Sequence, residues 1–241
     1  MTWHVLDVRA IWVKEFAAAL GSIEPVLGWE PILSKLGRLR SAESGWALPD
    51  PSLHVRRFPL QRGFARFPVD VLAAEGRRIA TRLRRAGPAN AVLVCTSPHY
   101  AGVARRWEGP VVYYVTDLFV AYGQSPAWIR RLDERMCAAA DLVCPNSRRT
   151  ADYLVAEASC DPARVEVVPN ATREANLLPA PSGGPGALPA DAADLPRPVL
   201  GVIGNLGENT DWTLLEQAIE RIGASWVFVG SPAMPIAAAM V

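Results

Sequence analysis

Three polar residues of this chain follow runs of apolar residues, at positions where α/β proteins carry out chemistry. Ser97 and His99 come shortly after the apolar run 91–95, and Asp117 comes shortly after the run 111–115. If both runs are parallel strands, these side chains lie beyond the carboxyl ends of a sheet, where ligands bind. There His99 can act as a base toward a hydroxyl or bind a phosphate, and Asp117 can orient a hydroxyl. The alternatives are local roles: a histidine that hydrogen-bonds at a helix start, and a carboxylate that caps a helix or turn.

A second chemical feature is a glycine-containing turn late in the chain. The apolar run 199–203 ends at Gly204, and an amphipathic helix is expected at 211–222. A strand, a glycine turn and a helix N-terminus together offer backbone N–H groups to an anion. We therefore expect the N–H groups of Gly204, Asn205 and Leu206 to contact phosphate groups. The G-x-G-x-x-G fingerprint is absent, which disfavours a dinucleotide-binding protein.

The remaining reactive residue types form no recognisable catalytic or metal-binding set. No group of His, Cys and carboxylates has metal-ligand spacing, and no G-x-S-x-G nucleophile elbow occurs. Cys95 and Cys144 lie in apolar runs and are expected to behave as small buried hydrophobes. Lys14 is expected at the surface. Ser147 precedes an expected helix at 148–156 and fits its N-cap.

The elements that must position these residues alternate between strand and helix. The expected strands are 3–8, 53–58, 91–95, 111–115, 142–144 and 165–168. The expected helices are 11–20, 69–85, 100–107, 126–140 and 148–156. In the helix at 69–85, Val71 and Leu72 are expected to face inward. Residues 21–51, rich in Gly, Pro and Trp, fit no element. This alternation predicts an α/β fold with a parallel sheet covered by helices on both faces.

The composition changes after residue 172. Residues 173–196 are rich in Pro, Gly and Ala and are expected to form an interdomain linker. After it come a strand at 199–203, a helix at 211–222 and a strand at 226–229. Two strands and one helix bury too little surface to offset their ordering entropy. We therefore expect this piece to dock on the first part, to pair with another chain, or to begin a longer domain, and we favour the last.

Charge is unevenly distributed although the net charge is only +1. Nine arginines lie between Arg56 and Arg85, against only Asp70 and Glu75. This stretch is either a solvated helix face or a contact with an anionic partner, such as a phosphorylated acceptor or a lipid surface. Nucleic acid is not favoured, because no aromatic residues are interleaved with the arginines and no reader motif occurs. With no signal peptide and no run of about 20 apolar residues, a cytoplasmic protein is predicted, with peripheral attachment to the inner membrane face left open.

Three blocks of the sequence together resemble retaining glycosyltransferases of the GT-B architecture, similar to glycosyltransferase family 4. They are residues 111–122, residues 140–154 followed by 165–170, and residues 201–216. The resemblance implies a Rossmann-like acceptor-binding domain over 1–172 and the start of a donor-binding domain over 197–241. It implies transfer of a hexose from a nucleotide-diphosphate sugar to a saccharide or lipid-linked acceptor, with no further cofactor and no protein-bound metal.

The resemblance also suggests which residues would contact each substrate. The acceptor side would use Ser97, His99, Asp117 and Tyr122, the last by stacking or packing. The donor side would use Gly204, Asn205, Leu206 and Ser147. No catalytic residue is assigned.

The chain departs from the family pattern in two places. Ala171 stands where the family usually has Gly after a Pro-Asn pair, and the Glu-x7-Glu pair of the donor-binding domain is not found. The second departure leaves an alternative open: a non-catalytic, truncated or split acceptor-binding lobe, completed by a partner chain. A GT-B-like nucleotide-sugar epimerase is a weaker alternative, because its donor-pocket carboxylates and His are not found.

Overall fold

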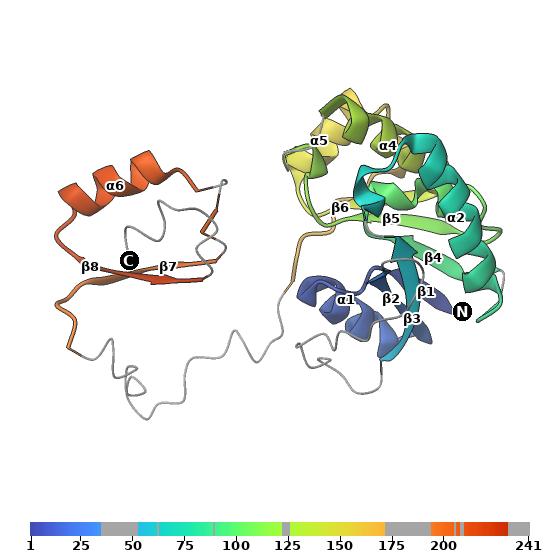
Figure 1. The fold of residues 1–241 in the computed structure, drawn as a ribbon, viewed down its shortest axis with the longest axis horizontal. Helices are drawn as coiled ribbons and strands as arrows, with labels where there is room; N and C mark the ends of the chain where they lie inside the picture. The colour runs from blue at the N-terminus through green and yellow to red at the C-terminus, as the bar shows by residue number, and fades with distance from the viewer. Residues whose placement is uncertain are drawn as a thin grey trace. The chain divides into compact units, whose positions relative to one another are not determined.

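The protein is described by a computed structural model of all 241 residues. The residues whose structure is described are 1–34, 53–61, 63–88, 90–121, 126–171, 194–204, 206–207 and 210–230. The chain divides into two compact units, Met1–Ala171 and Thr172–Val241. Figure 1 shows the elements of each unit, which are taken in turn.

The first unit is built on a six-stranded parallel sheet with strand order β3-β2-β1-β4-β5-β6. Its strands are β1 (Trp3–Leu6), β2 (Val26–Ser34), β3 (His54–Gln61), β4 (Val92–Cys95), β5 (Val111–Val115) and β6 (Leu142–Pro145). Its α-helices are α1 (Ile11–Gly21), α2 (Val69–Arg84), α3 (Ala101–Ala104), α4 (Pro126–Ala139) and α5 (Arg148–Glu157). Short 3-10 helices are η1 (Phe64–Arg66), η2 (Pro98–Tyr100), η3 (Phe119–Ala121) and η4 (Pro162–Arg164).

Each face of this sheet has its own core, because successive strand residues point to opposite faces. Val5 of β1 packs in a cluster with Val13 and Ala17 of α1. The next residue, Leu6, belongs to a larger cluster that includes Leu72 of α2 and Leu132 of α4. Figure 1 shows α1 on the other side of the sheet from α2 and α4. The predicted fold class, a parallel sheet with helices on both faces, is confirmed.

One strand of the sheet lies in the stretch that the sequence leaves unassigned. β2 contains Gly28 and Pro31, which interrupt its apolar pattern. β1 pairs with β2 only as far as Trp29, so Pro31 has a strand neighbour on the β3 side alone. A proline is tolerated there, since its missing N–H leaves no ladder bond unmade on the open side.

The strand expected at 165–168 is wrong. Val165 forms only an isolated bridge to Val143 of β6. The N–H groups of Glu166 and Val168 also donate to carbonyl oxygens of β6, each at 2.9 Å. The segment therefore runs beside the outer strand but does not extend the sheet.

The helix expected at 100–107 is shorter than predicted. Pro98 begins a 3-10 turn, η2, and only the single turn of α3 follows it. The chain then leaves the helix and buries Trp107, whose Nε1–H donates to the carbonyl oxygen of Ala91 at 2.6 Å.

Two helical side chains face the opposite way from their expected directions. Val71 is 44% exposed, because α2 turns Leu72, Ile79 and Leu83 toward the sheet instead. Lys14 was expected at the surface but is only 1% exposed on the inner face of α1. Its Nζ is buried and has no hydrogen-bond partner among the described residues.

The second unit contains β7 (Val199–Ile203), α6 (Trp212–Arg221) and β8 (Ser225–Val229), and its two strands pair in parallel. Asp211 is the N-cap of α6, where its Oδ1 accepts from the Leu214 N–H at 2.9 Å. Gly204 has a φ of 149°, a conformation that favours glycine. No residue of β7, α6 or β8 is fully buried. Within the described ranges of the whole chain, none of the helices is long and apolar enough to cross a membrane.

Candidate functional site

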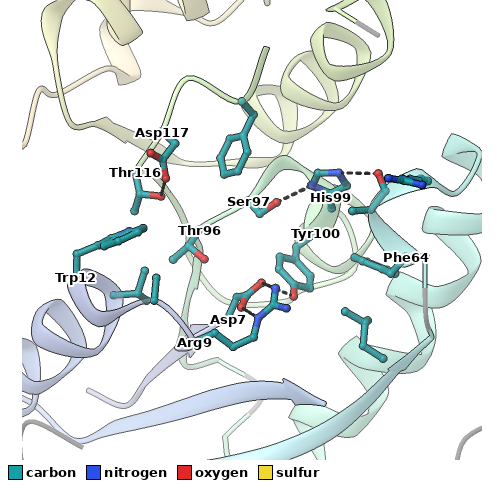
Figure 2. A pocket seen from close by; sticks show the side chains of 17 residues that line it. Asp7, Arg9, Trp12, Phe64, Thr96, Ser97, His99, Tyr100, Thr116 and Asp117 are labelled. Carbon is teal, nitrogen blue, oxygen red and sulfur yellow. Dashed lines mark hydrogen bonds and ion pairs between the residues drawn. The ribbon is translucent and has the colours of Figure 1, made fainter. Parts of the chain in front are cut away.

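The first unit contains a cavity of about 640 Å³ at the carboxyl ends of its central strands. The ends of β1, β4 and β5 contribute Asp7, Ser97 and Asp117 to its lining. α1 contributes Trp12, and η1 contributes Phe64. Figure 2 shows these side chains around the opening, with Asp7 between Trp12 and Phe64 in this view. The volume is within the usual range of about 300–1,000 Å³ for small-molecule sites.

Asp7 is held in a fixed position at the end of β1. Its backbone φ is 64°, an uncommon value for a residue with a Cβ. Arg9 donates from Nε to Asp7 Oδ1 at 2.5 Å and from its NH2 group to Oδ2 at 2.7 Å. Tyr100 donates its hydroxyl to the same Oδ2 at 3.0 Å. Burial and the negative charge of Asp7 raise the pKa of Tyr100 well above its usual value, so the hydroxyl remains a donor.

Ser97 and His99 form a hydrogen-bonded pair in the cavity. His99 Nε2 lies 3.3 Å from the carbonyl oxygen of Ala65, which can only accept, so Nε2 carries the proton. His99 Nδ1 is then the acceptor for the Ser97 hydroxyl at 2.7 Å. Burial lowers the pKa of His99, an effect that the hydrogen bond to Ala65 partly opposes. The imidazole is therefore neutral near pH 7, with its basic nitrogen directed at the Ser97 hydroxyl.

Asp117 lies on the opposite part of the lining, after β5. Its Oδ2 accepts from the Thr116 hydroxyl at 3.1 Å, and its carbonyl oxygen accepts from the Phe119 N–H at 3.1 Å. Asp117 therefore shapes the turn that leads into η3 and also presents its carboxylate to the cavity. Tyr122, the fourth residue expected on this side, lies outside the described residues.

The residues expected on the donor side are not in this cavity. Ser147 is the N-cap of α5, where its Oγ accepts from the Thr150 N–H at 3.3 Å, as the sequence predicts for a cap. Gly204 donates its N–H to the carbonyl oxygen of Val229 at 2.9 Å, and Leu206 is buried. Asn205 lies outside the described residues. A phosphate contact by this turn would therefore use N–H groups after that of Gly204, and the donor-side roles stay predictions.

Sequence reasoning missed Asp7, Arg9, Trp12 and Phe64. The first strand was expected to run from residue 3 to residue 8, so Asp7 was counted as part of the strand. An Asp that follows a buried apolar run is itself a signal that the strand ends there. Trp12 lies in the helix expected at 11–20, which gave no reason to single it out, and it is 46% exposed at the cavity. Phe64 belongs to a 3-10 turn that has no periodicity to read.

Over the described part of the chain, no group of three or more His, Cys, Asp or Glu side chains could hold a metal ion. The four cysteines are buried free thiols, as expected for Cys95 and Cys144.

Comparison with known proteins finds solved structures with a similar fold and a sequence family that this chain matches. HepE of Anabaena, in complex with UDP and glucose, is 14% identical with a TM-score of 0.67 over 99% of this chain and 62% of HepE. HepE in complex with UDP-glucose is 13% identical with a TM-score of 0.56, over 96% of this chain and 70% of HepE. A glycosyltransferase from Rickettsia africae is 11% identical with a TM-score of 0.57, over 99% of this chain and 63% of that one. This chain thus spans less than two thirds of the length of HepE in the first comparison.

At these identities, the solved structures establish the fold only, which is Rossmann-like and of the GT-B type. No curated protein matches the sequence. Residues 34–174, more than half of the chain, match the sequence pattern of the family described as Glycosyltransferase Family 4. The chain therefore belongs to glycosyltransferase family 4.

Proposed function

We propose that this protein takes part in transferring a hexose from a nucleotide-diphosphate sugar to a saccharide or lipid-linked acceptor. The observation that carries the proposal is the cavity lined by Ser97, His99 and Asp117 at the carboxyl ends of β4 and β5, in a chain of glycosyltransferase family 4. HepE, which shares the fold, has been seen with UDP and glucose. In this proposal the first unit binds the acceptor and the second unit binds the donor.

The proposed chemistry depends mainly on positioning. The acceptor hydroxyl oxygen forms a bond to the anomeric carbon of the donor, and the bond from that carbon to the diphosphate breaks with its electron pair. Ser97 Oγ accepts a hydrogen bond from the acceptor hydroxyl, while its own proton points to His99 Nδ1. The acceptor proton can then pass through Ser97 to His99, which is neutral and able to receive it. Asp117 orients the hydroxyl, and retention of configuration is expected from the family resemblance.

On the donor side, we propose that backbone N–H groups between β7 and α6 stabilise the leaving diphosphate. The glycine conformation at Gly204 and the Asp211 cap at the start of α6 support this assignment. The N–H of Gly204 itself donates to the carbonyl oxygen of Val229. In this proposal the diphosphate is therefore bound by backbone N–H groups that follow Gly204 in the chain.

The test is titration of the full chain with UDP- and GDP-hexoses, followed by an assay for hexose transfer to sugar and lipid-linked acceptors. We expect heat with at least one nucleotide sugar and a new glycosidic product detected by mass. Ser97→Ala should reduce product formation without changing nucleotide binding. Absence of heat with every nucleotide sugar, together with absence of product, contradicts the proposal.

A second proposal, an acceptor-binding lobe completed by further polypeptide, has its own supporting observation. Ile203 of β7 is 81% exposed, Leu214 of α6 is 63% exposed and Val229 of β8 is 52% exposed. A βαβ unit whose apolar residues are this exposed gains stability when more strands and helices cover it. A neighbouring or in-frame coding segment with a Glu-x7-Glu pair, whose product restores transfer when co-expressed, would support this proposal. Transfer by the chain alone would exclude it.

We also propose that the basic face of α2 contacts an anionic membrane surface. Arg77, Arg82 and Arg85 are exposed on this face and have no ion-pair partner among the described residues. Arg78 and Arg84, in contrast, pair with acidic side chains at 2.8 Å and 3.0 Å. A face with three uncompensated arginines attracts anionic lipid at about 1 kcal/mol per charge.

A further inference from the structure

We propose that the cavity of the first unit takes a neutral sugar ring that stacks on Trp12. This inference rests on the proposed acceptor role of the cavity and deepens it by naming the class of group that enters. It adds residues that have no role in the proposal above: Asp7, Arg9, Trp12 and Phe64.

The first argument is the exposure of Trp12. Its side chain is 46% exposed although it lines the cavity, whereas Phe64, also in the lining, is only 4% exposed. In Figure 2 the indole lies at one side of the opening, across from Phe64. Phe64 packs against Tyr100 and His99 at ring distances of 5.7 Å and 6.3 Å, so it forms part of the wall. Phe119, the other aromatic side chain of the lining that is not fully buried, lies edge-on to His99 at a ring distance of 6.4 Å and is half-buried. Trp12 is therefore the most exposed aromatic surface that the lining offers to a ligand.

The second argument is the balance of charge. Two carboxylates, Asp7 and Asp117, and two guanidinium groups, Arg9 and Arg66, line the cavity. Arg9 is already paired with Asp7 through two hydrogen bonds. His99 is neutral because burial lowers its pKa. The lining therefore has no net charge that would select an anionic ligand, and a charged ligand would lose hydration without a compensating excess of opposite charge.

The third argument is the mixture of donors and acceptors. The Asp7 and Asp117 carboxylates accept hydrogen bonds, and Arg66 donates them. The Thr96 hydroxyl donates to the Leu6 carbonyl oxygen, and the Ser97 hydroxyl donates to His99 Nδ1. Toward the cavity, both hydroxyl oxygens are therefore acceptors. A sugar ring matches this lining, because it has an apolar face for Trp12 and hydroxyls that both donate and accept. A flat apolar group would displace water from these carboxylate and hydroxyl oxygens and offer them no hydrogen bond in return.

The test uses the full chain without any nucleotide. Methyl α-glucoside, methyl α-mannoside and methyl α-galactoside are the neutral probes, glucose 6-phosphate is the anionic probe, and 4-nitrophenol is the flat aromatic probe. We measure binding by titration and by saturation-transfer NMR. At least one neutral glycoside should bind, and glucose 6-phosphate should bind no more tightly than that glycoside.

Variants of α1 assign the binding to Trp12. Trp12→Ala should weaken the neutral glycoside about tenfold, whereas Trp12→Phe, which keeps an aromatic face, should stay within about threefold. Ile11→Ala is the matched control, because Ile11 is 44% exposed on the same helix and does not line the cavity. It should bind the sugar as the parent chain does. Because Trp12 and Ile11 are each just over half buried, thermal unfolding of every variant checks that it is folded at the temperature of the titration.

Three results would overturn the inference: no neutral glycoside binds, the phosphorylated sugar or the nitrophenol binds at least tenfold more tightly, or Trp12→Ala binds the glycoside like the parent. The outcome is separate from that of the transfer assay. Sugar binding that depends on Trp12 in a chain that transfers nothing would leave this inference standing and reject the proposed function. Transfer without any effect of Trp12 would do the reverse.

Discussion

Asp7 Oδ2 accepts the Tyr100 hydroxyl at 3.0 Å, which joins the end of β1 to the 3-10 turn after β4, 93 positions later in the chain. This hydrogen bond spans two neighbouring strand ends at the floor of the cavity. It also holds Asp7 in a backbone conformation that is uncommon for a residue with a side chain.

Tyr100→Phe should therefore lower the free energy of unfolding by about 1–2 kcal/mol, since it removes a partly buried hydrogen bond to a charged acceptor. Asp7 keeps Arg9 as its other partner in this variant. Urea denaturation of both proteins measures the change. Tyr114→Phe is the matched control, because Tyr114 is buried and its hydroxyl makes no hydrogen bond to a described residue. Equal losses in the two variants would show that the Asp7 contact contributes nothing.

The Ser97–His99 pair gives a prediction on activity and pH. If His99 receives the acceptor proton, His99→Ala should lower kcat about a hundredfold or more and leave the nucleotide-sugar KM nearly unchanged. A base acts in its neutral form, and burial places the pKa of His99 below 6.5. The rate should therefore stay level from pH 8 to 6.5 and fall only in more acidic solution.

Ser97→Ala separates a catalytic role from a structural one. It removes the hydroxyl that donates to Nδ1 and stabilises neutral His99, so the pKa of His99 should rise, as followed by NMR of the imidazole. The acid limb of the rate profile should move to higher pH with it. An unchanged profile in a folded variant would mean that the pair only caps η2.

Much of the sheet could be predicted, because its central strands are short apolar runs between turn residues. The ends of β5 and β7 coincide with the expected runs 111–115 and 199–203. β2 could not be recognised, since Gly28 and Pro31 break its pattern, and only the staggered pairing with β1 makes Pro31 acceptable. The register between strands that are far apart in the chain cannot be predicted from a short stretch of sequence.

The site was predictable only in part, and for a similar reason. Ser97, His99 and Asp117 follow apolar runs, so the sequence places them at strand ends, and the structure brings them to one cavity. Trp12 and Lys14 sit on the same helix, and their directions depend on how α1 rotates against the sheet. Lys14 was expected at the surface, but the packing of Val13 and Ala17 against the sheet turns Lys14 inward and leaves Trp12 46% exposed.

The proposed membrane contact predicts salt-dependent vesicle binding. The full chain should co-sediment with vesicles of 30% phosphatidylserine in 50 mM salt and be released in 500 mM salt, because screening weakens exposed charges. Replacing Arg77, Arg82 and Arg85 by Gln should reduce the bound fraction at low salt. The control is Arg130→Gln plus Arg131→Gln, which removes two exposed arginines from a different helix, α4. Binding that survives high salt, or that the α4 variant loses equally, would contradict an electrostatic contact through α2.

His4 predicts a loss of stability in mild acid. It is fully buried beside Trp29, whose Nε1–H donates to His4 Nδ1 at 3.2 Å, and burial, with a smaller effect from Arg56, lowers its pKa to about 4. The unfolded chain binds this proton near pH 6.5, so between pH 6.5 and 4 the stability falls as the pH falls, by up to about 1.4 kcal/mol per unit. His4→Gln should remove that slope. Urea denaturation at several pH values gives the slope of the unfolding free energy against pH for each protein. This slope can be compared even if the variant is less stable than the parent at neutral pH.

Asp133 predicts a slope of the opposite sign in almost the same window. It is 2% exposed and accepts the hydroxyls of Tyr113 at 2.8 Å and Tyr153 at 3.1 Å, but burial outweighs these bonds and raises its pKa to about 6. Between about pH 4 and 6 the folded chain binds more protons than the unfolded chain, so stability falls as the pH rises.

In the parent protein the contributions of His4 and Asp133 therefore offset each other between about pH 4 and 6. Asp133→Asn keeps the size of the side chain and removes the contribution of Asp133. The stability of this variant should therefore rise more steeply with pH than that of the parent protein. His4→Gln should tilt the curve the other way, and the double variant should return close to the parent slope, since the two sites share no partner. If the single variants keep the parent slope, neither group titrates differently in the folded and unfolded states, and the burial argument is wrong for both.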